Sequence, residues 1–274
     1  MSGTLVGLLQ LSSQPDVAAN LATISRLARE AAGRGASIVA LPENFSLMGA
    51  GDEARAAAAE VLTDGAGGPV LDALRALAVR HRVSLVGGGM AERSADPERP
   101  FNSAVALDPS GHIVAVYRKI HLFDVDLADG TTLTESASTT PGGDVVVCDL
   151  GGLKVGLSIC YDLRFPELFR RLREAGAELV FVPAAFTLTT GRDHWHALLR
   201  ARAIEQQVWV AAPAQWGAHP KGRQTYGKSL LVDPWGDVVA QAPEGVGVVV
   251  GEVRAGRTDE VRRAMPVARH RVLR

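Results

Sequence analysis

The sequence has little cysteine, few aromatic residues and no long apolar run, and these shortages exclude several classes of protein. Its 274 residues include two cysteines, too few for a disulfide framework, so we expect free thiols in a reducing compartment. No window approaches the ~18 consecutive apolar residues of a membrane-spanning helix. The N-terminal segment has no basic residue ahead of its short apolar run, which predicts a strand and not a signal peptide. We therefore expect a soluble, cytoplasmic protein.

The sequence also lacks an excess of charge of either sign. Lys and Arg total 29 and Asp and Glu total 30, which leaves a formal net charge of −1. A chain this balanced has no global attraction to nucleic acid or to an anionic membrane, so neither is expected as a partner. No Pro-, Gly- or Ser-rich linker divides the chain, which predicts one domain over residues 1–274.

Short apolar runs alternate with helical patterns, which predicts an α/β fold with mixed sheets. Residues 108–111 and 233–236 are typical of turns between antiparallel strands. Residues 87–89, three glycines after an apolar run, predict a tight turn. The predicted strands are residues 4–11, 37–41, 83–87, 101–107, 112–118, 144–149, 153–159, 178–182, 207–212, 228–233 and 246–253. The predicted helices lie near residues 15–33, 52–62, 69–82, 166–175, 192–206 and 254–264.

Two pairs of segments suggest a faint internal repeat. Residues 36–45 (ASIVALPENF) are similar to residues 177–186 (AELVFVPAAF), and residues 5–8 are similar to residues 154–157. Two such halves, packed sheet against sheet, would share one core and carry their helices outside. Chance similarity between two αβ units is the alternative interpretation.

Three residues at predicted strand ends have side chains suited to catalysis. Cys160 ends an apolar strand shortly before Pro166, a residue that favours the first turn of a helix. A thiol near a helix N-terminus is expected to have a lowered pKa and to be nucleophilic. Glu43 directly follows a buried strand, and Lys119 lies between two apolar segments. Taken singly, Cys160 also fits a buried thiol with an apolar role, Glu43 a surface carboxylate, and Lys119 a charge on an edge strand.

Taken together, the three residues support one mechanism. A thiol nucleophile at Cys160 needs a base that removes its proton and later activates water, and Glu43 suits both tasks. The tetrahedral intermediate needs a positive charge and an N–H donor, which Lys119 and the backbone N–H of Tyr161 would supply. Spacing along the chain does not show that these residues converge.

Around these residues the sequence resembles the nitrilase, or carbon–nitrogen hydrolase, superfamily. The matching segments are LPENF at Glu43, YRKIHLF at Lys119 and SICYDLRFPEL at Cys160, and the resemblance covers almost the whole chain. It implies a Glu–Lys–Cys set at these positions. The pattern E-S-x-x-x-x-P-G at residues 135–142 implies that Glu135 is the second carboxylate found in many members.

The resemblance also carries expectations about fold, reaction and assembly. It implies a four-layer αββα sandwich and hydrolysis of a non-peptide C–N bond through a thioester. It implies that no metal and no organic cofactor is needed. Members form dimers or larger homo-oligomers, often through the helix that follows the cysteine motif and the helix near residues 192–206.

Within the superfamily, residues 121–126, 160–166 and 191–195 look like the Nit group of amidases. That group includes ω-amidase, which acts on 2-oxoglutaramate, and deaminated glutathione amidase. Residues 185–191 are closer to the first, whereas the longer stretch within residues 214–236 is closer to the second. We therefore expect deaminated glutathione as the substrate. The alternatives are 2-oxoglutaramate, a nitrile or another aliphatic amide, and a catalytically idle binding protein on the same fold.

Three further residues are candidates for substrate binding. Arg164 is expected to bind a substrate carboxylate with its bidentate guanidinium, and an ion pair with Asp162 or Glu167 is the alternative. Phe186 and Thr187 are expected to line the pocket, since the repeat places this strand end opposite Glu43.

One predicted helix contains two histidines that could suggest a metal site. His194 and His196 are two positions apart and therefore do not share a helix face, and no third ligand accompanies them. No metal site is expected there.

Overall fold

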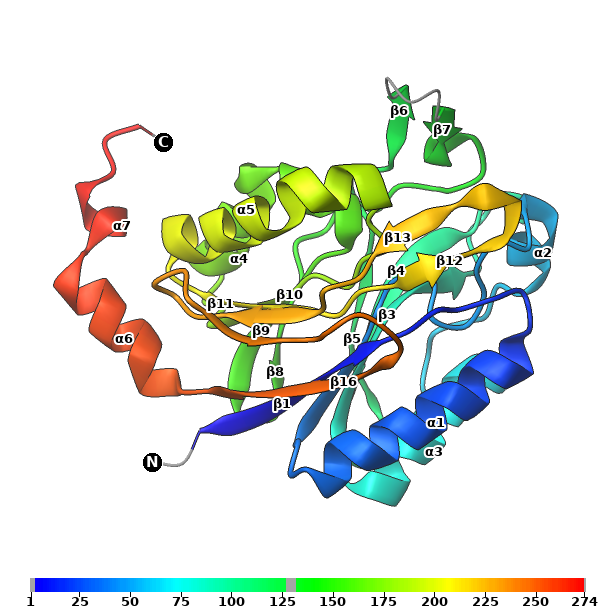
Figure 1. Cartoon of the computed structure of the whole chain (residues 1–274), viewed down its shortest axis with the longest axis horizontal. Helices are drawn as coiled ribbons and strands as arrows, with labels where there is room; N and C mark the ends of the chain where they lie inside the picture. The colour runs from blue at the N-terminus through cyan, green and yellow to red at the C-terminus, as the bar shows by residue number, and fades with distance from the viewer. Residues whose placement is uncertain (1–2, 127–131, 274) are drawn as a thin grey trace.

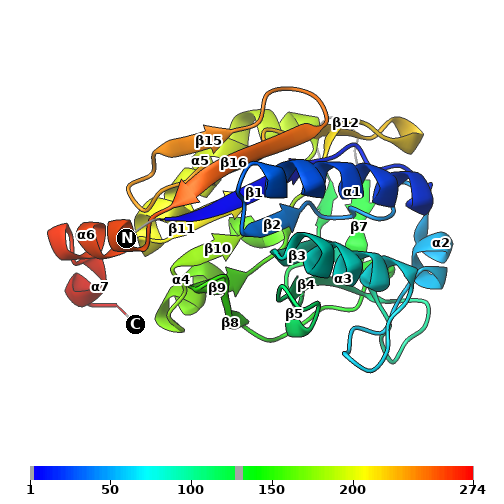
Figure 2. The same ribbon diagram turned by 90° about the horizontal axis from the view of Figure 1, so that it is seen from below.

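Two six-stranded mixed sheets pack face to face between two pairs of helices (Figure 1). This computed structural model describes residues 3–126 and 132–273. Helices α1 (Val17–Gly33) and α3 (Pro69–His81) cover one sheet, as Figure 2 shows from below. Helices α4 (Pro166–Glu174) and α5 (Leu188–Gln206) lie over the other sheet. The four-layer αββα sandwich confirms the predicted fold class.

Every predicted strand overlaps an observed one, and together they account for the strands of the two sheets except residues 238–241, which were not predicted. In the first sheet the order is β16 (Gly247–Val253), β1 (Thr4–Gln10), β2 (Ile38–Leu41), β3 (Ser84–Glu92), β4 (Phe101–Leu107) and β5 (Ile113–Arg118). In the second it is β15 (Val238–Gln241), β14 (Leu230–Val232), β11 (Trp209–Ala212), β10 (Leu179–Phe181), β9 (Leu153–Leu157) and β8 (Val147–Leu150). The central strands β1–β2–β3 and β9–β10–β11 pair in parallel, and the remaining pairs are antiparallel.

The two sheets follow the same pairing pattern. The series β1 to β5 in the first sheet corresponds to β9, β10, β11, β14 and β15 in the second. Each series has one extra antiparallel strand beside its first member, β16 or β8. The similar segments 36–45 and 177–186 contain β2 and β10, and the shorter pair lies in β1 and β9. The faint repeat therefore marks equivalent strands of the two sheets.

Strand β2 shows how one sheet contributes to two layers of core. Ile38 and Ala40 belong to the core between the sheets, whereas Val39 and Leu41 pack toward α1 and α3. Because successive side chains of a strand point to opposite faces, a continuous apolar run is needed to bury both faces. This requirement explains why β2 contains no polar residue.

Several local predictions need correction. The predicted helix over residues 52–62 ends early, as α2 (Asp52–Ala57), and Glu60 instead bridges to β3. Helix α5 begins at Leu188 because Thr187 caps it. Two hairpins escaped prediction because their strands have three residues each, too few for a periodic pattern. They are β6 (Asp124–Asp126) with β7 (Thr132–Thr134) and β12 (Trp216–Ala218) with β13 (Gln224–Tyr226).

The prediction of a tight turn at residues 87–89 is wrong, since β3 continues through these glycines with an irregular register. A Cβ atom on Gly88 would lie 2.1 Å from Pro183 Cβ. Gly89 has φ +67°, and a Cβ atom there would lie 2.8 Å from Glu43 Cγ. The glycines therefore let the loops that follow β2 and β10 approach this strand.

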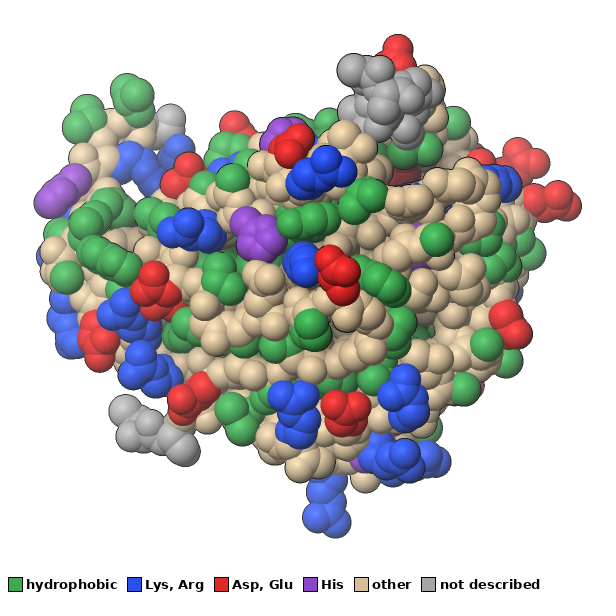
Figure 3. All heavy atoms as spheres, in the orientation of Figure 1, with side chains coloured by type: hydrophobic (Ala, Val, Ile, Leu, Met, Phe, Trp, Pro, Cys, Tyr) green, Lys and Arg blue, Asp and Glu red, His purple; other side chains and the backbone are tan. Residues whose placement is uncertain are grey.

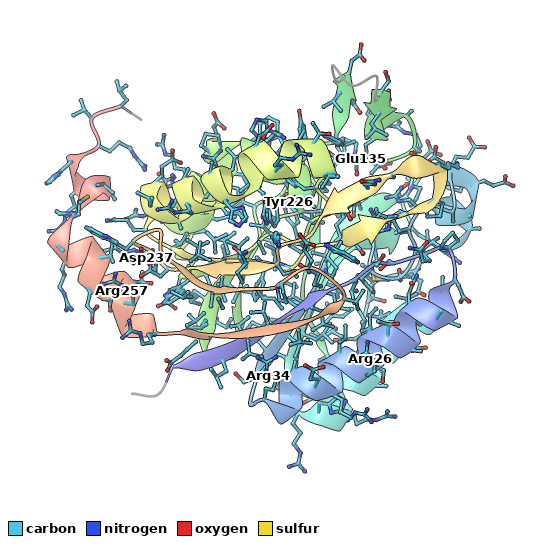
Figure 4. The ribbon with its side chains drawn as sticks, in the orientation of Figure 1. Arg26, Arg34, Glu135, Tyr226, Asp237 and Arg257 are labelled. Carbon is cyan, nitrogen blue, oxygen red and sulfur yellow. The ribbon has the colours of Figure 1, made fainter. Side chains whose placement is uncertain are left out.

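The chain ends in α6 (Ala255–Ala264) and α7 (Val267–His270), which extend away from the sandwich (Figure 1). Arg257, labelled in Figure 4, lies on α6, and its Nε donates a hydrogen bond of 2.8 Å to Asp233 Oδ2, which ties α6 to the turn after β14. Acidic and basic side chains are interspersed over the face shown in Figure 3. Within residues 3–126 and 132–273, no helix has the length and apolar character needed to cross a membrane.

Candidate active site

Glu43 is held by contacts to both sheets. It follows β2 and Pro42, and the N–H of Asn44 donates to the carbonyl of Gly89 at 2.8 Å. Glu43 Oε2 accepts a 3.1 Å hydrogen bond from the N–H of Ala185, in the loop after β10. Only 3% of Glu43 is exposed. The carboxylate thus stands, buried, where the two sheets meet at their strand ends.

Lys119 follows β5 and contacts two carboxylates. Its Nζ donates to Glu43 Oε1 at 3.0 Å and to Glu135 Oε2 at 2.8 Å. Burial works to lower the pKa of Lys119, but the charges of Glu135 and Glu43 outweigh it and raise the pKa above its usual value. Lys119 therefore remains a cation although it is 2% exposed.

Glu135 opens a short 3-10 helix at the foot of the β6–β7 hairpin (Figure 4). Besides Lys119, its Oε2 accepts a hydrogen bond of 2.7 Å from the N–H of Phe123. Burial works to raise the pKa of Glu135, but the charge of Lys119 and these hydrogen bonds hold it below its usual value. Glu135 is therefore an anion at neutral pH.

Asn102 joins the two carboxylates, and the sequence analysis missed it. It lies on β4, and its Nδ2 donates to Glu43 Oε1 at 3.0 Å and to Glu135 Oε1 at 3.1 Å. Its main chain also contributes, because its carbonyl accepts a 2.8 Å hydrogen bond from the N–H of Lys119. The only signal in the sequence is an amide side chain near the start of an otherwise apolar strand.

Cys160 has an unusual backbone conformation for a residue other than glycine. Its φ is +48°, and its N–H donates to the carbonyl of Pro183 at 2.9 Å. It begins a 3-10 helix, Cys160–Arg164, and α4 starts only at Pro166. Cys160 therefore lies between a strand and a helix, as predicted, and it begins a 3-10 turn ahead of α4.

The expected low pKa of the Cys160 thiol is wrong. Burial, followed by the charge of Glu43, raises the pKa of Cys160 well above its usual value, although Lys119 acts in the opposite sense. The side chain is 8% exposed. The thiol is therefore protonated at neutral pH, and it must lose its proton to a base in order to act as a nucleophile.

Asp162 connects the lysine and cysteine segments. Its fully buried carboxylate accepts a 2.7 Å hydrogen bond from Tyr117 Oη and one of 3.1 Å from the N–H of His121. His121 Nδ1 lies 2.7 Å from the same carboxylate. Because Tyr117 and His121 flank Lys119, and Asp162 is two residues from Cys160, this network fixes the two segments against each other.

All the residues singled out from the sequence line one cavity of about 290 Å³. They are Glu43, Lys119, Glu135, Cys160, Tyr161, Arg164, Phe186 and Thr187. They come from the strand ends of both sheets, from the 3-10 helices and from the residue that caps α5. Within the cavity, the carboxylates of Glu43 and Glu135 and the ammonium of Lys119 form a buried cluster beside the protonated thiol of Cys160. This arrangement suits proton transfer and stabilisation of an oxyanion.

Comparison with known proteins shows the family to which the chain belongs. Residues 5–263 match the family model described as carbon-nitrogen hydrolase. The chain belongs to the carbon–nitrogen hydrolase family. It is 41% identical over 276 residues to the deaminated glutathione amidase of Synechocystis sp. (strain PCC 6803 / GT-S), a match that covers 99% of each chain.

Solved structures give the same result. The crystal structure of the Caenorhabditis elegans NitFhit protein is similar with a TM-score of 0.91 and 37% identity, covering 99% of this chain and 66% of that one. A variant of the amidase from Nesterenkonia sp. AN1 has a TM-score of 0.79 and 27% identity, covering 98% and 97%. In that amidase, the acetamide moiety of fluoroacetamide is covalently attached to the active-site cysteine. The present chain is a nitrilase-superfamily amidase.

In this carbon–nitrogen hydrolase, Arg164 contacts aromatic rings and a histidine. Its guanidinium carbon lies 5.4 Å from the ring centroid of Phe186 and 5.8 Å from that of Tyr161. Its Nη1 lies 3.4 Å from His194 Nδ1. Across the described residues Arg164 forms no ion pair with Asp162 or Glu167, so that alternative is wrong. The charge of Arg164 is therefore available to a ligand in the cavity.

Two more arginines of this hydrolase line the cavity, and the sequence analysis missed both. Arg55 Nη1 donates to the carbonyl of Ser138 at 3.1 Å, and burial lowers the pKa of its guanidinium. Arg223 Nη2 donates to the carbonyl of Ala185 at 3.3 Å. Both guanidinium groups thus contact neutral carbonyls. Arg55 lies outside the segments that resemble a family, whereas Arg223 lies within residues 214–236, whose resemblance to one group of amidases could have drawn attention to it.

The paired histidines of α5 point to separate partners. His194 contacts Arg164, whereas His196 Nε2 lies 2.8 Å from Gln241 Oε1 on β15. Among the residues that the structure describes, no group of three or more His, Cys, Asp or Glu side chains is arranged to hold a metal ion.

Proposed function

We propose that this amidase hydrolyses deaminated glutathione through a thioester on Cys160. The observation that carries the substrate is the similarity, over the full length of both chains, to a protein named deaminated glutathione amidase. The reaction type is supported by the cavity, where Glu43, Lys119 and Glu135 stand beside the thiol.

In the first half-reaction, Glu43 takes the proton of the Cys160 thiol as the sulfur attacks the amide carbonyl carbon. The carbonyl oxygen becomes an oxyanion, which Lys119 Nζ and the backbone N–H of Tyr161 stabilise. The intermediate collapses when the C–N bond breaks, and Glu43 returns the proton to the leaving amine. The amine departs and the acyl group remains as a thioester on Cys160.

In the second half-reaction, Glu43 takes a proton from water, and the resulting hydroxide adds to the thioester carbon. The C–S bond breaks, the proton returns to the sulfur and the carboxylic acid leaves. For deaminated glutathione the products are cysteinylglycine and 2-oxoglutarate. Glu135 and Asn102 keep Lys119 and Glu43 in place through both half-reactions.

Arg164 is proposed to bind the carboxylate of the 2-oxo acid, because its guanidinium lines the cavity and has no acidic partner among residues 3–126 and 132–273. Phe186 and Thr187 line the same part of the cavity and would contact the carbon chain of the acyl group. We also propose that the chain forms a single domain. We further propose that it associates into homo-oligomers, whose molar mass light scattering after size-exclusion chromatography measures.

The decisive experiment measures release of 2-oxoglutarate from deaminated glutathione and from 2-oxoglutaramate, side by side, with Cys160→Ala as the blank. We expect a higher kcat/KM for deaminated glutathione and no release by the variant. A higher kcat/KM for 2-oxoglutaramate would identify an ω-amidase, which the similarity of residues 185–191 favours. Release from neither compound would overturn the substrate and direct the search to other amides and nitriles.

A further inference from the structure

A second cavity of about 600 Å³, here called the outer groove, adjoins the first. Both cavities are lined by Asn44, Asp52, Arg55, Leu133, Thr187 and Arg223. Sites for small molecules usually enclose roughly 300–1,000 Å³, so the inner cavity alone is small for a ligand of tripeptide size. The two cavities therefore lie side by side, with these six residues between them.

The far wall of the outer groove is the turn Pro220–Gly222, which joins β12 to β13. This turn packs against the loop before α2, and Figure 1 shows the β12–β13 hairpin on the same side of the molecule as α2. A Cβ atom on Gly49 would lie 2.7 Å from Pro220 Cδ, and one on Gly51 would lie 3.7 Å from Lys221 Nζ. The ammonium group of Lys221 therefore stands at this wall of the groove.

The outer groove carries more positive than negative charge. Among the residues that the structure describes, its lining contains Arg55, Lys221 and Arg223 but one acidic residue, Asp52. The chain has four lysines, and in its described part the ion pairs engage only the other three, residues 119, 154 and 228. Among the described residues, Arg223 Nε is buried without a hydrogen-bond partner. A carboxylate in the groove would balance its positive charge and would accept hydrogen bonds from Lys221 Nζ and Arg223 Nε.

The lining also indicates which part of a substrate enters the groove. Cys160 and Arg164 line the inner cavity only, whereas Arg55 and Arg223 line both. An acyl group attached to Cys160 and bound by Arg164 fills the inner cavity. The space past Arg55 and Arg223 is then left for the group on the other side of the scissile bond.

We propose that the outer groove is the leaving-group subsite, and that Lys221 binds a carboxylate at the end of a peptide-like leaving amine. This inference rests on the proposed function. The leaving amine of deaminated glutathione is cysteinylglycine, which ends in a carboxylate. The leaving group of 2-oxoglutaramate is ammonia, which has no atoms to place in the groove. The outer groove thus determines which of the two substrates this amidase prefers.

The experiment compares kcat/KM for deaminated glutathione, for its analogue with a carboxamide at the C-terminus, and for 2-oxoglutaramate. The enzymes are the wild type, Lys221→Gln and Lys154→Gln. Lys154→Gln is the control, because Lys154 is exposed on β9 and does not line the groove. We expect the wild type to prefer the carboxylate over the carboxamide by about tenfold, a typical effect of one charged hydrogen bond. Lys221→Gln should reduce this preference to within about twofold, and Lys154→Gln should retain it.

Each result bears on the subsite in a distinct way. If Lys221→Gln keeps the wild-type preference for the carboxylate, the subsite is overturned while hydrolysis of deaminated glutathione stands. The same holds if the wild type hydrolyses the acid and the carboxamide equally well. If the wild type acts on 2-oxoglutaramate better than on deaminated glutathione, the proposed substrate fails, and the subsite fails with it.

Discussion

The strand ends after β2 and after β10 occupy equivalent places in the two sheets but carry different side chains. The first reads Pro42-Glu43 and the second Pro183-Ala184. Where the first half of the molecule presents a carboxylate, the second presents a methyl group, and the next N–H, that of Ala185, donates to Glu43. One half thus supplies the charge, and the equivalent loop supplies a neutral donor that holds it.

The ends of β1 and β9 differ in the same way. Aligning residues 5–8 with residues 154–157 places Leu11 opposite Cys160. Leu11 is a buried core residue that bridges to Gln215, whereas Cys160 adopts φ +48° and lines the cavity. The two halves have similar backbones but do not each form a site. The single site needs different side chains from the two halves, which face the same cavity.

The largest effect is expected when the second half loses its nucleophile. Cys160→Ala, which makes this strand end as inert as its counterpart, should lower kcat by at least about a thousandfold, because no other group forms the thioester. Steady-state kinetics on the preferred amide measure the loss. Cys148→Ala, on the edge strand β8, is the matched control and should retain activity. Substantial turnover by the Cys160 variant would refute the covalent mechanism.

The next effect tests the contribution of the first half. Glu43→Gln keeps the size of the side chain but removes the base, so kcat should fall by roughly a hundredfold or more. The control is Glu30→Gln, an exposed carboxylate on α1 of the same half. Pre-steady-state measurement of thioester formation locates the defect. A variant with the kcat of the wild type would show that the base is another group.

A smaller effect is expected from Asn102, which joins the carboxylates of Glu43 and Glu135. Asn102→Ala removes both hydrogen bonds and should lower kcat by about tenfold. Because the bond from Asn102 contributes to the low pKa of Glu135, its loss should raise that pKa. The acid limb of the kcat profile should then move to higher pH. An unchanged pH profile alongside a lower kcat would indicate a purely structural role.

The smallest effect concerns stability. The pKa of Glu135 is lower in the folded state than its usual value, so its ion pair with Lys119 stabilises the fold at pH values above about 4.3. This contribution is lost as pH falls through the lowered folded pKa. Urea unfolding should therefore show wild type more stable than Glu135→Gln at pH 7, with the difference shrinking at strongly acidic pH. Glu98→Gln, in an exposed turn, should show no such trend.

Much of the fold was predictable because it depends on near neighbours in the chain. Buried strands need unbroken apolar runs, and the side chains of Asp108 and Asp233 accept hydrogen bonds from N–H groups two residues ahead, which closes the two predicted hairpin turns. The candidate site was predictable where long motifs resemble those of a family, around Glu43, Lys119, Glu135 and Cys160. The strands of the β6–β7 and β12–β13 hairpins were not, since they have three residues each and, unlike β10 and β14, lie in no apolar run that would indicate a strand.

The sequence by itself thus determined the order of the strands along the chain, the main turns and the residues able to carry amide hydrolysis. The tertiary structure decided that these residues share one cavity, that Asn102 links two carboxylates, and that Lys221 stands at the wall of a second space. It also reversed the expected pKa of Cys160. The physical reason is range: periodicity and turn chemistry act over a few residues, whereas burial and the hydrogen bond from Asn102 to Glu43, 59 residues apart, depend on how distant segments pack.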